Sequence, residues 1–371
     1  MWKTRTFCLT ISVVDFSSLL LQAKRARCLS TSLLLIWLAV FLSACDAPPA
    51  FESVRFSGGT MGTTYNVTVV TPSGTTLPEG LGDSIQGWLD EVNQHMSTYI
   101  DDSELSRLNR APVGEWLPVS PMMLRVLKQA RAVSDITGGA FDITIGPLVD
   151  AWGFGPVDTH DQVPAEAALE ALQQKVGYTR LRLRDSPPAL WKEAELQLDL
   201  SAIAKGFGAD YVAEQLAAAG LPNSLVEIGG DLRVQGHNAA GKPWRIGVEQ
   251  PSFQREGVQQ AVELDNGGVA TSGDYRNFFR QNGQMYSHIL DPRLGRPVER
   301  DLASVTVIAD NAAMADALAT GLTVMGREAA LALAEQQNLP VFLIIKREVV
   351  RKGEGFDTAQ SSAFASYLGD D

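Results

Sequence analysis

The segment Asp199–Asp210, with the sequence DLSAIAKGFGAD, constrains the fold most, because the hydrophobic pattern of the chain changes period there. Before it, polar and apolar residues alternate from Glu195 to Leu200, which is typical of a half-buried strand. After it, apolar residues recur at helical spacing as far as Gly220. These helical positions are Phe207, Tyr211, Val212, Leu216 and Ala219. The sequence therefore predicts that the chain leaves a sheet and enters a helix at this segment.

A strand-to-helix junction of this kind is suited to binding an anionic ligand, since it presents free backbone N–H groups and the positive end of a helix dipole. Asp199, Ser201 and Lys205 stand at its mouth. The alternative interpretation is that Asp199 or Ser201 only caps the helix and that Lys205 is solvated. The local sequence supports both interpretations, so other segments have to decide between a ligand site and a helix cap.

The N-terminal segment resembles a bacterial lipoprotein export signal. Lys24, Arg25 and Arg27 precede an apolar run at 33–42, and the run is followed by Ser, Ala and then Cys45. In such signals the cysteine is lipidated and becomes the new N-terminus. A transmembrane helix would need about 20 consecutive apolar residues, so this run is too short to be one.

We therefore expect residues 1–44 to be a signal peptide, residues 45–54 a tether and residues 55–371 one domain. A lipid on Cys45 would anchor the mature protein to a membrane. Asp46 follows the cysteine, as in the signal that keeps enterobacterial lipoproteins on the inner membrane. The expected location is the periplasmic face of the bacterial inner membrane.

The charge of the chain argues against nucleic acid as a partner. Of the 371 residues, 31 are Lys or Arg and 43 are Asp or Glu, for a net charge of −12. The expected leader contains five of the basic residues and one acidic residue, so the remainder has 26 basic and 42 acidic residues and a net charge of −16. Such a body repels nucleic acid. Cys8 and Cys28 also lie in the leader, which leaves Cys45 alone and rules out an internal disulfide or a cysteine metal site in the mature chain.

Asp316 and Thr320 form a candidate metal site on a second predicted helix, which spans residues 311–324. They are four residues apart, so both side-chain oxygens lie on one helix face. A carboxylate with a hydroxyl suits a hard cation, and Mg²⁺ in particular is often shared with substrate phosphates. The alternative is that Thr320 bonds back to its own helix and Asp316 faces water.

Two further segments carry chemically useful groups. The small turn Thr271–Gly273, followed by Arg276, is a candidate cradle for an anion. Residues 286–290 are expected to form a strand that ends at a turn at 291–292. His288 lies near the end of this strand and is the candidate general base, although a single histidine is more often structural. The competing histidines, on a predicted helix or in predicted loops, are His95, His160 and His237.

Eight segments, taken in order, resemble the ApbE family, the FAD:protein FMN transferases. They are SGGTMGT, GAFD, GPLVDAWGFG, DLSAIAKGFGAD, EIGGD, TSGDYRN, SHILDP and ADALATGL. The resemblance runs from Arg55 to Ile345, and a lipoprotein leader is usual in that family. It implies an α+β fold, related to the T-fold, in which mixed or antiparallel sheets and packed helices form a two-lobed unit.

The resemblance also implies a set of site residues. Mg²⁺ would be held by the main-chain oxygen of Ala202 and by Asp316 and Thr320. Ala319 stands where some members carry a polar or acidic group, which makes the metal shell of this chain less complete. FAD would be met by Met61, Tyr99, Ala140, Phe141, Asp142, Asp199, Lys205 and the backbone at Leu290.

The expected reaction is transfer of the FMN moiety of FAD to a Ser or Thr hydroxyl of a periplasmic or membrane flavoprotein, such as a redox-complex subunit, with release of AMP. This attack needs charge neutralisation by Mg²⁺ and Arg276, and a base, for which His288 is the candidate. Two alternatives use the same cleft. One is an FAD pyrophosphatase that yields FMN and AMP, and the other is a lipid-anchored flavin-binding protein without turnover.

Overall fold

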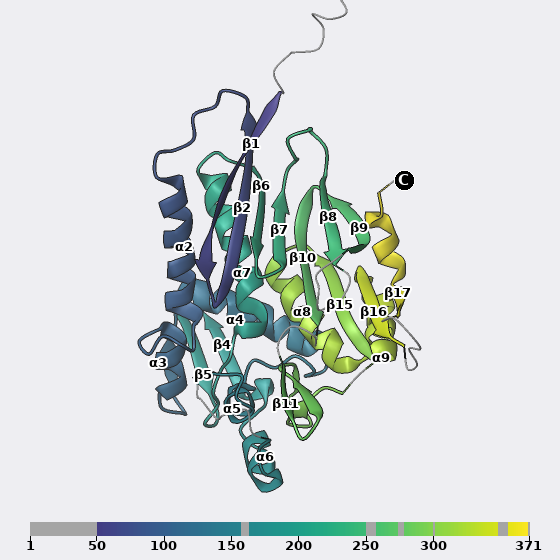
Figure 1. Ribbon diagram of the computed structural model, residues 1–371. Coiled ribbons are helices and arrows are strands. Elements are labelled where there is room, and N and C mark those ends of the chain that lie inside the picture. The colour runs from purple at the N-terminus through teal and green to yellow at the C-terminus, as the bar shows by residue number, and fades with distance from the viewer. Residues whose placement is uncertain are drawn as a thin grey trace, which may run out of the picture. The chain divides into compact units, whose positions relative to one another are not determined.

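The central element of the fold is an eight-stranded sheet in the order β1-β2-β6-β7-β10-β15-β16-β17, in which every neighbouring pair is antiparallel (Figure 1). The computed structural model describes residues 50–156, 163–249, 257–273, 278–299, 301–347 and 355–369, which belong to one unit. The strands are β1 (Phe51–Thr60), β2 (Thr63–Pro72), β6 (Asn223–Ile228), β7 (Asp231–Gln235), β10 (Asn266–Gly273), β15 (Leu302–Ala309), β16 (Val341–Lys346) and β17 (Phe356–Gln360).

Helices cover one face of this sheet, and a hairpin covers the other. Alternate residues of β16 show the division, because Leu343 packs with the helices whereas Phe342 and Ile344 pack with the hairpin. The hairpin consists of β8 (Trp244–Glu249) and β9 (Val258–Leu264), and the short helix η2 (Ser362–Tyr367) packs beside it. The helices on the sheet are α2 (Leu81–Met96), α7 (Ser201–Ala218), α8 (Ala312–Met325) and α9 (Arg327–Gln336), and α4 (Pro121–Ile136) packs against α7 and α8.

A smaller lobe lies below the large sheet in Figure 1. Its sheet has the order β3-β5-β4 and packs against α4 through Leu117, Leu181 and Leu190. No helix in the described ranges is long and apolar enough to cross a membrane. The elements of this lobe are α3 (Glu104–Arg110), β3 (Trp116–Pro118), α5 (Gly146–Ala151), α6 (Glu166–Gln173), η1 (Tyr178–Arg180), β4 (Leu181–Asp185), β5 (Pro188–Lys192), β11 (Phe278–Gln281), β12 (Gln284–Ser287), β13 (Leu290–Asp291) and β14 (Arg296–Pro297).

The predicted fold class, α+β with antiparallel sheets and packed helices, is confirmed. Helix starts follow the capping residues of the sequence. The Ser120 hydroxyl accepts the N–H of Met123 where α4 begins, and the Asn311 side chain accepts the N–H of Met314 where α8 begins. Local capping therefore sets the position of α8 and, with it, that of Asp316.

The prediction of a strand at 195–200 is wrong, although the alternation of burial is present. The segment forms only an isolated parallel bridge, between Gln197 and Ile145. The backbone of Leu198 instead exchanges two hydrogen bonds with the Asn109 side chain, at 2.7 and 2.9 Å. Because a side chain takes the place of a neighbouring strand, the segment is extended without being part of a sheet.

Two predicted boundaries also differ. The strand expected through 286–290 is interrupted, since β12 ends at Ser287 and β13 begins at Leu290. The Ser287 hydroxyl accepts the N–H of Ile289, which turns the chain between the two strands. At the other end of the protein, β1 begins at Phe51, so residues 51–54 are part of the sheet and not of a tether. The leader and Cys45 lie outside the described residues.

Candidate functional site

The candidate site lies where two glycine turns meet the first turns of α7. Met61 and Gly62 form the β1–β2 turn with φ angles of 49° and 72°, and Gly229 at the β6–β7 turn has a φ of 58°. A Cβ atom on Gly229 would lie 2.9 Å from Thr63 Cγ2 and 3.4 Å from Lys205 Cδ. The glycine therefore allows the Lys205 stem to lie between the two turns.

Helices α7 and α8 touch through their backbones beside this site. A Cβ atom on Gly206 would lie 2.2 Å from the carbonyl oxygen of Ala312, so no larger residue fits there. The buried Asp210 carboxylate fixes the same contact, because it accepts the N–H groups of Ala312 and Ala313 at 2.8 and 2.9 Å. This contact brings Asp316, one turn into α8, opposite Lys205.

A charge cluster results from this packing, in which both carboxylates are buried and the Lys205 side chain is 30% exposed. The Lys205 ammonium is 2.9 Å from Asp231 Oδ2 and 3.3 Å from Asp316 Oδ2. Burial favours the neutral amine, but the two carboxylates outweigh it and raise the pKa of Lys205. Burial, and then the nearby Asp316, raise the pKa of Asp231, whereas Lys205 opposes the shift. The carboxylates of this cluster are suited to binding a cation, and the ammonium is suited to binding phosphate oxygens.

The predicted magnesium ligands fit this arrangement. Asp316 is 3% exposed, so the alternative that it faces water is wrong. Its Oδ2 accepts the N–H of Gly206 at 3.1 Å, which holds the carboxylate against the helical turn that carries the Ala202 carbonyl. The Thr320 hydroxyl lies 3.0 Å from the Ser272 hydroxyl on β10. A carboxylate, a hydroxyl and a carbonyl are the oxygen donors that Mg²⁺ prefers.

The structure does not by itself show a metal site. Among the described residues, no group of three or more His, Cys, Asp or Glu side chains is placed to hold a metal ion. The buried Ala319, next to Thr320 on α8, has no side-chain oxygen to offer a metal ion. The protein therefore supplies few donors, and phosphate oxygens or water would have to complete the coordination shell of the cation. The magnesium site therefore stays a prediction.

Two predicted flavin contacts, Asp199 and Asp142, also hold the local backbone. Asp199 Oδ1 accepts the N–H of Ser201 at 2.8 Å and its hydroxyl at 2.5 Å, so Asp199 does stabilise the start of α7, as the alternative interpretation states. Asp142 accepts the N–H and the hydroxyl of Thr144 and the N–H of Tyr178. Burial raises the pKa of Asp142 despite these hydrogen bonds.

Aromatic side chains form one wall near the mouth of α7. Tyr99 is 69% exposed, and its hydroxyl lies 3.5 Å from the Phe154 carbonyl oxygen. Burial, and then Asp199 and Asp150, raise the pKa of Tyr99. Phe154 in turn lies 6.3 Å from the His288 ring, at 71°. An exposed tyrosine beside these rings suits a flat ligand.

The structure also places the other predicted contacts. Ala140 and Leu290 are buried, and Ala140 packs against Ile289. Phe141 is buried beside Gly321 of α8, where a Cβ atom would lie 3.2 Å from its own. The Met61 methyl group lies 2.9 Å from the Cβ position of Gly208 on α7. Their side chains therefore pack within the fold, and their roles toward a ligand stay predictions.

His288 remains the candidate base, and the structure does not test that role. The buried Asp291 carboxylate accepts hydrogen bonds from Arg293 in its own turn. His95 lies 2.5 Å from Glu104, and His237 packs edge-on against Phe51. His160 and Arg276 lie outside the described residues.

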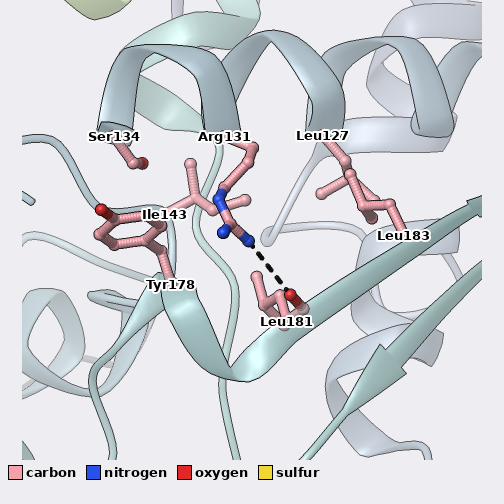
Figure 2. A pocket seen from close by; sticks show the side chains of 7 residues that line it. All are labelled: Leu127, Arg131, Ser134, Ile143, Tyr178, Leu181 and Leu183. Atoms are coloured by element: carbon pink, nitrogen blue, oxygen red, sulfur yellow. Dashed lines mark hydrogen bonds between the residues drawn. The ribbon is translucent and has the colours of Figure 1, made fainter. Parts of the chain in front are cut away.

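A cavity beneath α4 is separate from this site. Figure 2 shows it between α4 and β4, with the Arg131 guanidinium donating to the Leu181 carbonyl oxygen at 3.3 Å. Its volume of about 10 Å³ admits no more than about one water molecule. A flavin therefore cannot bind there. The residues that line it are Leu127, Arg131, Ser134, Ile143, Tyr178, Leu181 and Leu183.

The sequence analysis assigned no role to Asp231, although this residue contacts Lys205. One sequence signal points to it. Asp231 is the first residue of β7 and lies two residues before the buried Arg233, so both side chains are on the same, inward face of the strand. An acidic residue at an inward-facing position directly after a Gly-Gly bend is unusual.

Comparison with known proteins agrees with this geometry. Residues 61–343 match the family model described as "ApbE family". The chain is 44% identical over 330 residues to the FAD:protein FMN transferase of Vibrio cholerae serotype O1, covering 89% of this chain and 96% of that protein. It is 40% identical over 342 residues to the protein of the same name from Haemophilus influenzae, covering 91% and 97%.

Solved structures agree as well. The flavin transferase ApbE from Vibrio cholerae superposes with a TM-score of 0.77 at 44% identity, covering 86% of this chain and all of that chain. The apo form of the Pseudomonas stutzeri flavinyl transferase ApbE superposes with a TM-score of 0.77 at 37% identity, covering 88% and 100%. The resemblance carried by the eight sequence segments is thus confirmed, and the chain belongs to the ApbE family.

Proposed function

We propose that this protein transfers the FMN moiety of FAD to a Ser or Thr hydroxyl of a periplasmic or membrane flavoprotein, with Mg²⁺ bound and AMP released. The relatives with 40–44% identity over about nine-tenths of this chain carry the name FAD:protein FMN transferase. The observation in the structure that supports the proposal most is the charge cluster of Lys205 with the buried Asp231 and Asp316, beside glycine turns and the start of α7. Such a site can bind a pyrophosphate that has a divalent cation attached to it.

The reaction breaks the pyrophosphate bond that joins the FMN and AMP parts of FAD. The acceptor oxygen attacks the FMN phosphorus, a new P–O bond forms, and the bond to the AMP oxygen breaks. Asp316, Thr320 and the Ala202 carbonyl would hold Mg²⁺, which supplies charge neutralisation on the phosphate oxygens. Lys205 would contact the phosphates. His288 takes the proton of the acceptor hydroxyl.

Incubation with FAD, MgCl₂ and a periplasmic acceptor domain is expected to add the mass of FMN to the acceptor and to release AMP. Intact mass spectrometry of the acceptor and chromatography of the nucleotides measure both products. Free FMN and AMP with an unmodified acceptor would favour the pyrophosphatase instead. Bound, intact FAD without either product would favour a flavin-binding protein.

Removal of divalent cations with EDTA is expected to stop transfer, and added MgCl₂ to restore it. The matching variant is Asp316→Asn, which keeps the size of the buried side chain. Asp316→Ala would leave the N–H of Gly206 without its acceptor and Lys205 with Asp231 as its remaining carboxylate partner. Transfer rates in both experiments are measured by acceptor mass. Full activity in excess EDTA would exclude the cation from the reaction.

Cys45→Ala is expected to release the protein from the membrane, because this cysteine ends the lipoprotein signal and is the only one in the mature chain. Fractionation and labelling with a palmitate analogue measure the effect in cells. The proposed location is the periplasmic face of the inner membrane. A variant that stays membrane-bound and is labelled like the parent would contradict lipidation at this residue.

A further inference from the structure

The Lys205 ammonium lies closer to Asp231 than to Asp316, the predicted metal ligand. Its distances to the nearest oxygens are 2.9 Å and 3.3 Å, respectively. Both carboxylates are buried, and they reach the ammonium from β7 and from α8. One lysine on α7 is thus shared between two acidic side chains.

The surroundings of Asp231 indicate that Lys205 is its main partner. The Lys205 ammonium lies 2.9 Å from Asp231 Oδ2, an atom that accepts no hydrogen bond of good geometry within the described residues, and it also donates to Oδ1 and Oδ2 of Asp316 at 3.4 and 3.3 Å. Asp316, by contrast, also accepts the N–H of Gly206. Asp231 is therefore poised to hold the lysine, whereas Asp316 is already fixed by the backbone of α7.

This sharing has a consequence for cation binding. An ammonium that pairs fully with Asp316 would compete with a divalent cation for the same carboxylate oxygens, and burial makes that competition strong. A second carboxylate gives the ammonium another partner.

We propose that Asp231 is a positioning residue that holds the Lys205 ammonium and so leaves Asp316 available to a divalent cation. The inference rests on the cation site of the proposed function. It requires no contact between Asp231 and the cation, and it makes cation affinity depend on Asp231 through Lys205.

Isothermal titration of the full chain with MgCl₂, without flavin, tests this dependence. Asp231→Asn is expected to weaken Mg²⁺ binding by about tenfold or more, in the range seen when residues that orient metal ligands are replaced. The Lys205→Met variant is expected to bind Mg²⁺ at least as tightly as the parent. In the Lys205→Met variant, adding Asp231→Asn is expected to change the Mg²⁺ affinity by no more than about twofold to threefold, because the competing ammonium is absent.

The matched control is Glu227→Gln, which removes one negative charge from the other strand of the same β6–β7 turn. Its side chain accepts the N–H of Gly230 rather than contacting Lys205, so Mg²⁺ affinity should stay within about twofold of the parent. Thermal unfolding in EDTA verifies that each variant is folded, and Asp231→Glu replaces Asp231→Asn if that variant unfolds. Glutamate keeps the charge and should retain most of the affinity.

Three results would overturn the inference. An equal loss of affinity with and without Lys205 would make Asp231 a direct ligand. An unchanged affinity in Asp231→Asn would remove its role while leaving the cation site of the proposed function intact. A parent protein that binds no Mg²⁺ would remove both.

Discussion

Replacing His288 with Asn is expected to slow FMN transfer by ~10²- to 10⁴-fold, the effect typical of a lost general base. Asparagine is polar and of similar size but cannot take up the proton of the acceptor hydroxyl. FAD binding should be retained, because His288 is assigned to proton transfer and not to holding the ligand. Single-turnover transfer measured by acceptor mass, together with FAD titration by flavin fluorescence, separates the two effects.

His237→Asn is the matched control for this experiment. His237 packs against Phe51 at the start of β1, whereas Met61 lies at the opposite end of the hairpin. Its replacement should leave both transfer and FAD binding unchanged. If His288→Asn loses FAD binding instead, His288 is a ligand contact and another group must act as the base.

Asp210→Ala is expected to lower the free energy of unfolding by about 3–5 kcal/mol, the usual cost of removing one partner of a buried ion pair. The side chain is 1% exposed, accepts the first two N–H groups of α8, and lies 3.5 Å from Arg233 Nε. The variant leaves these donors buried without an acceptor. Urea denaturation followed by circular dichroism measures the loss.

Asp135→Ala provides the comparison, since its exposed carboxylate pairs with the exposed Arg131 one turn away, at 3.1 Å. The expected loss there is about 0.5 kcal/mol or less. Equal losses in the two variants would show that Asp210 does not hold α8 in place.

The pH dependence of Asp210 has a definite sign. Burial raises its pKa from 3.8 to about 6, although the two N–H groups and Arg233 oppose the shift. The folded state therefore binds the proton more tightly than the unfolded state, and this residue's contribution to stability falls as the pH rises from about 4 to 6. Subtracting the unfolding free energy of Asp210→Asn from that of the parent should reveal this decline; a rise over the same interval would contradict the sign.

Local sequence signals were sufficient to predict much of the fold. The predicted helix at 311–324 matches α8 to within one residue at each end, and the Asn311 side chain caps its start. The segment at 195–200 shows the limit. Its alternation correctly predicted burial, but its hydrogen-bonding partners are the Asn109 side chain and the backbone of Ile143 and Gly146, all far away in the sequence. A period of two indicates which residues are inside and does not reveal what pairs with the backbone.

The candidate site was predictable only in part for the same reason. Asp316 and Thr320 are four residues apart on one helix, so their common face follows from the sequence. Asp231 enters the cluster from β7 and Lys205 from α7, and only the packing of α7 against the sheet and α8 brings them together. The contact at Gly206 likewise depends on Ala312, more than a hundred residues away. Such long-range proximity has no local signature.

The length of the β1–β2 hairpin sets the distance between Phe51, where the chain enters the domain, and the Met61 turn. Each strand has ten residues, and all ten pairs are in register from Phe51 and Pro72 to Thr60 and Thr63. At about 3.3 Å per residue, the ribbon carries the Met61 turn roughly 30 Å away from the point where the chain enters the domain. If the protein is anchored through the residues before Phe51, the Met61 turn lies roughly 30 Å along the hairpin from that end. An acceptor anchored to the same membrane would then have to present its hydroxyl at a similar distance from its own anchor.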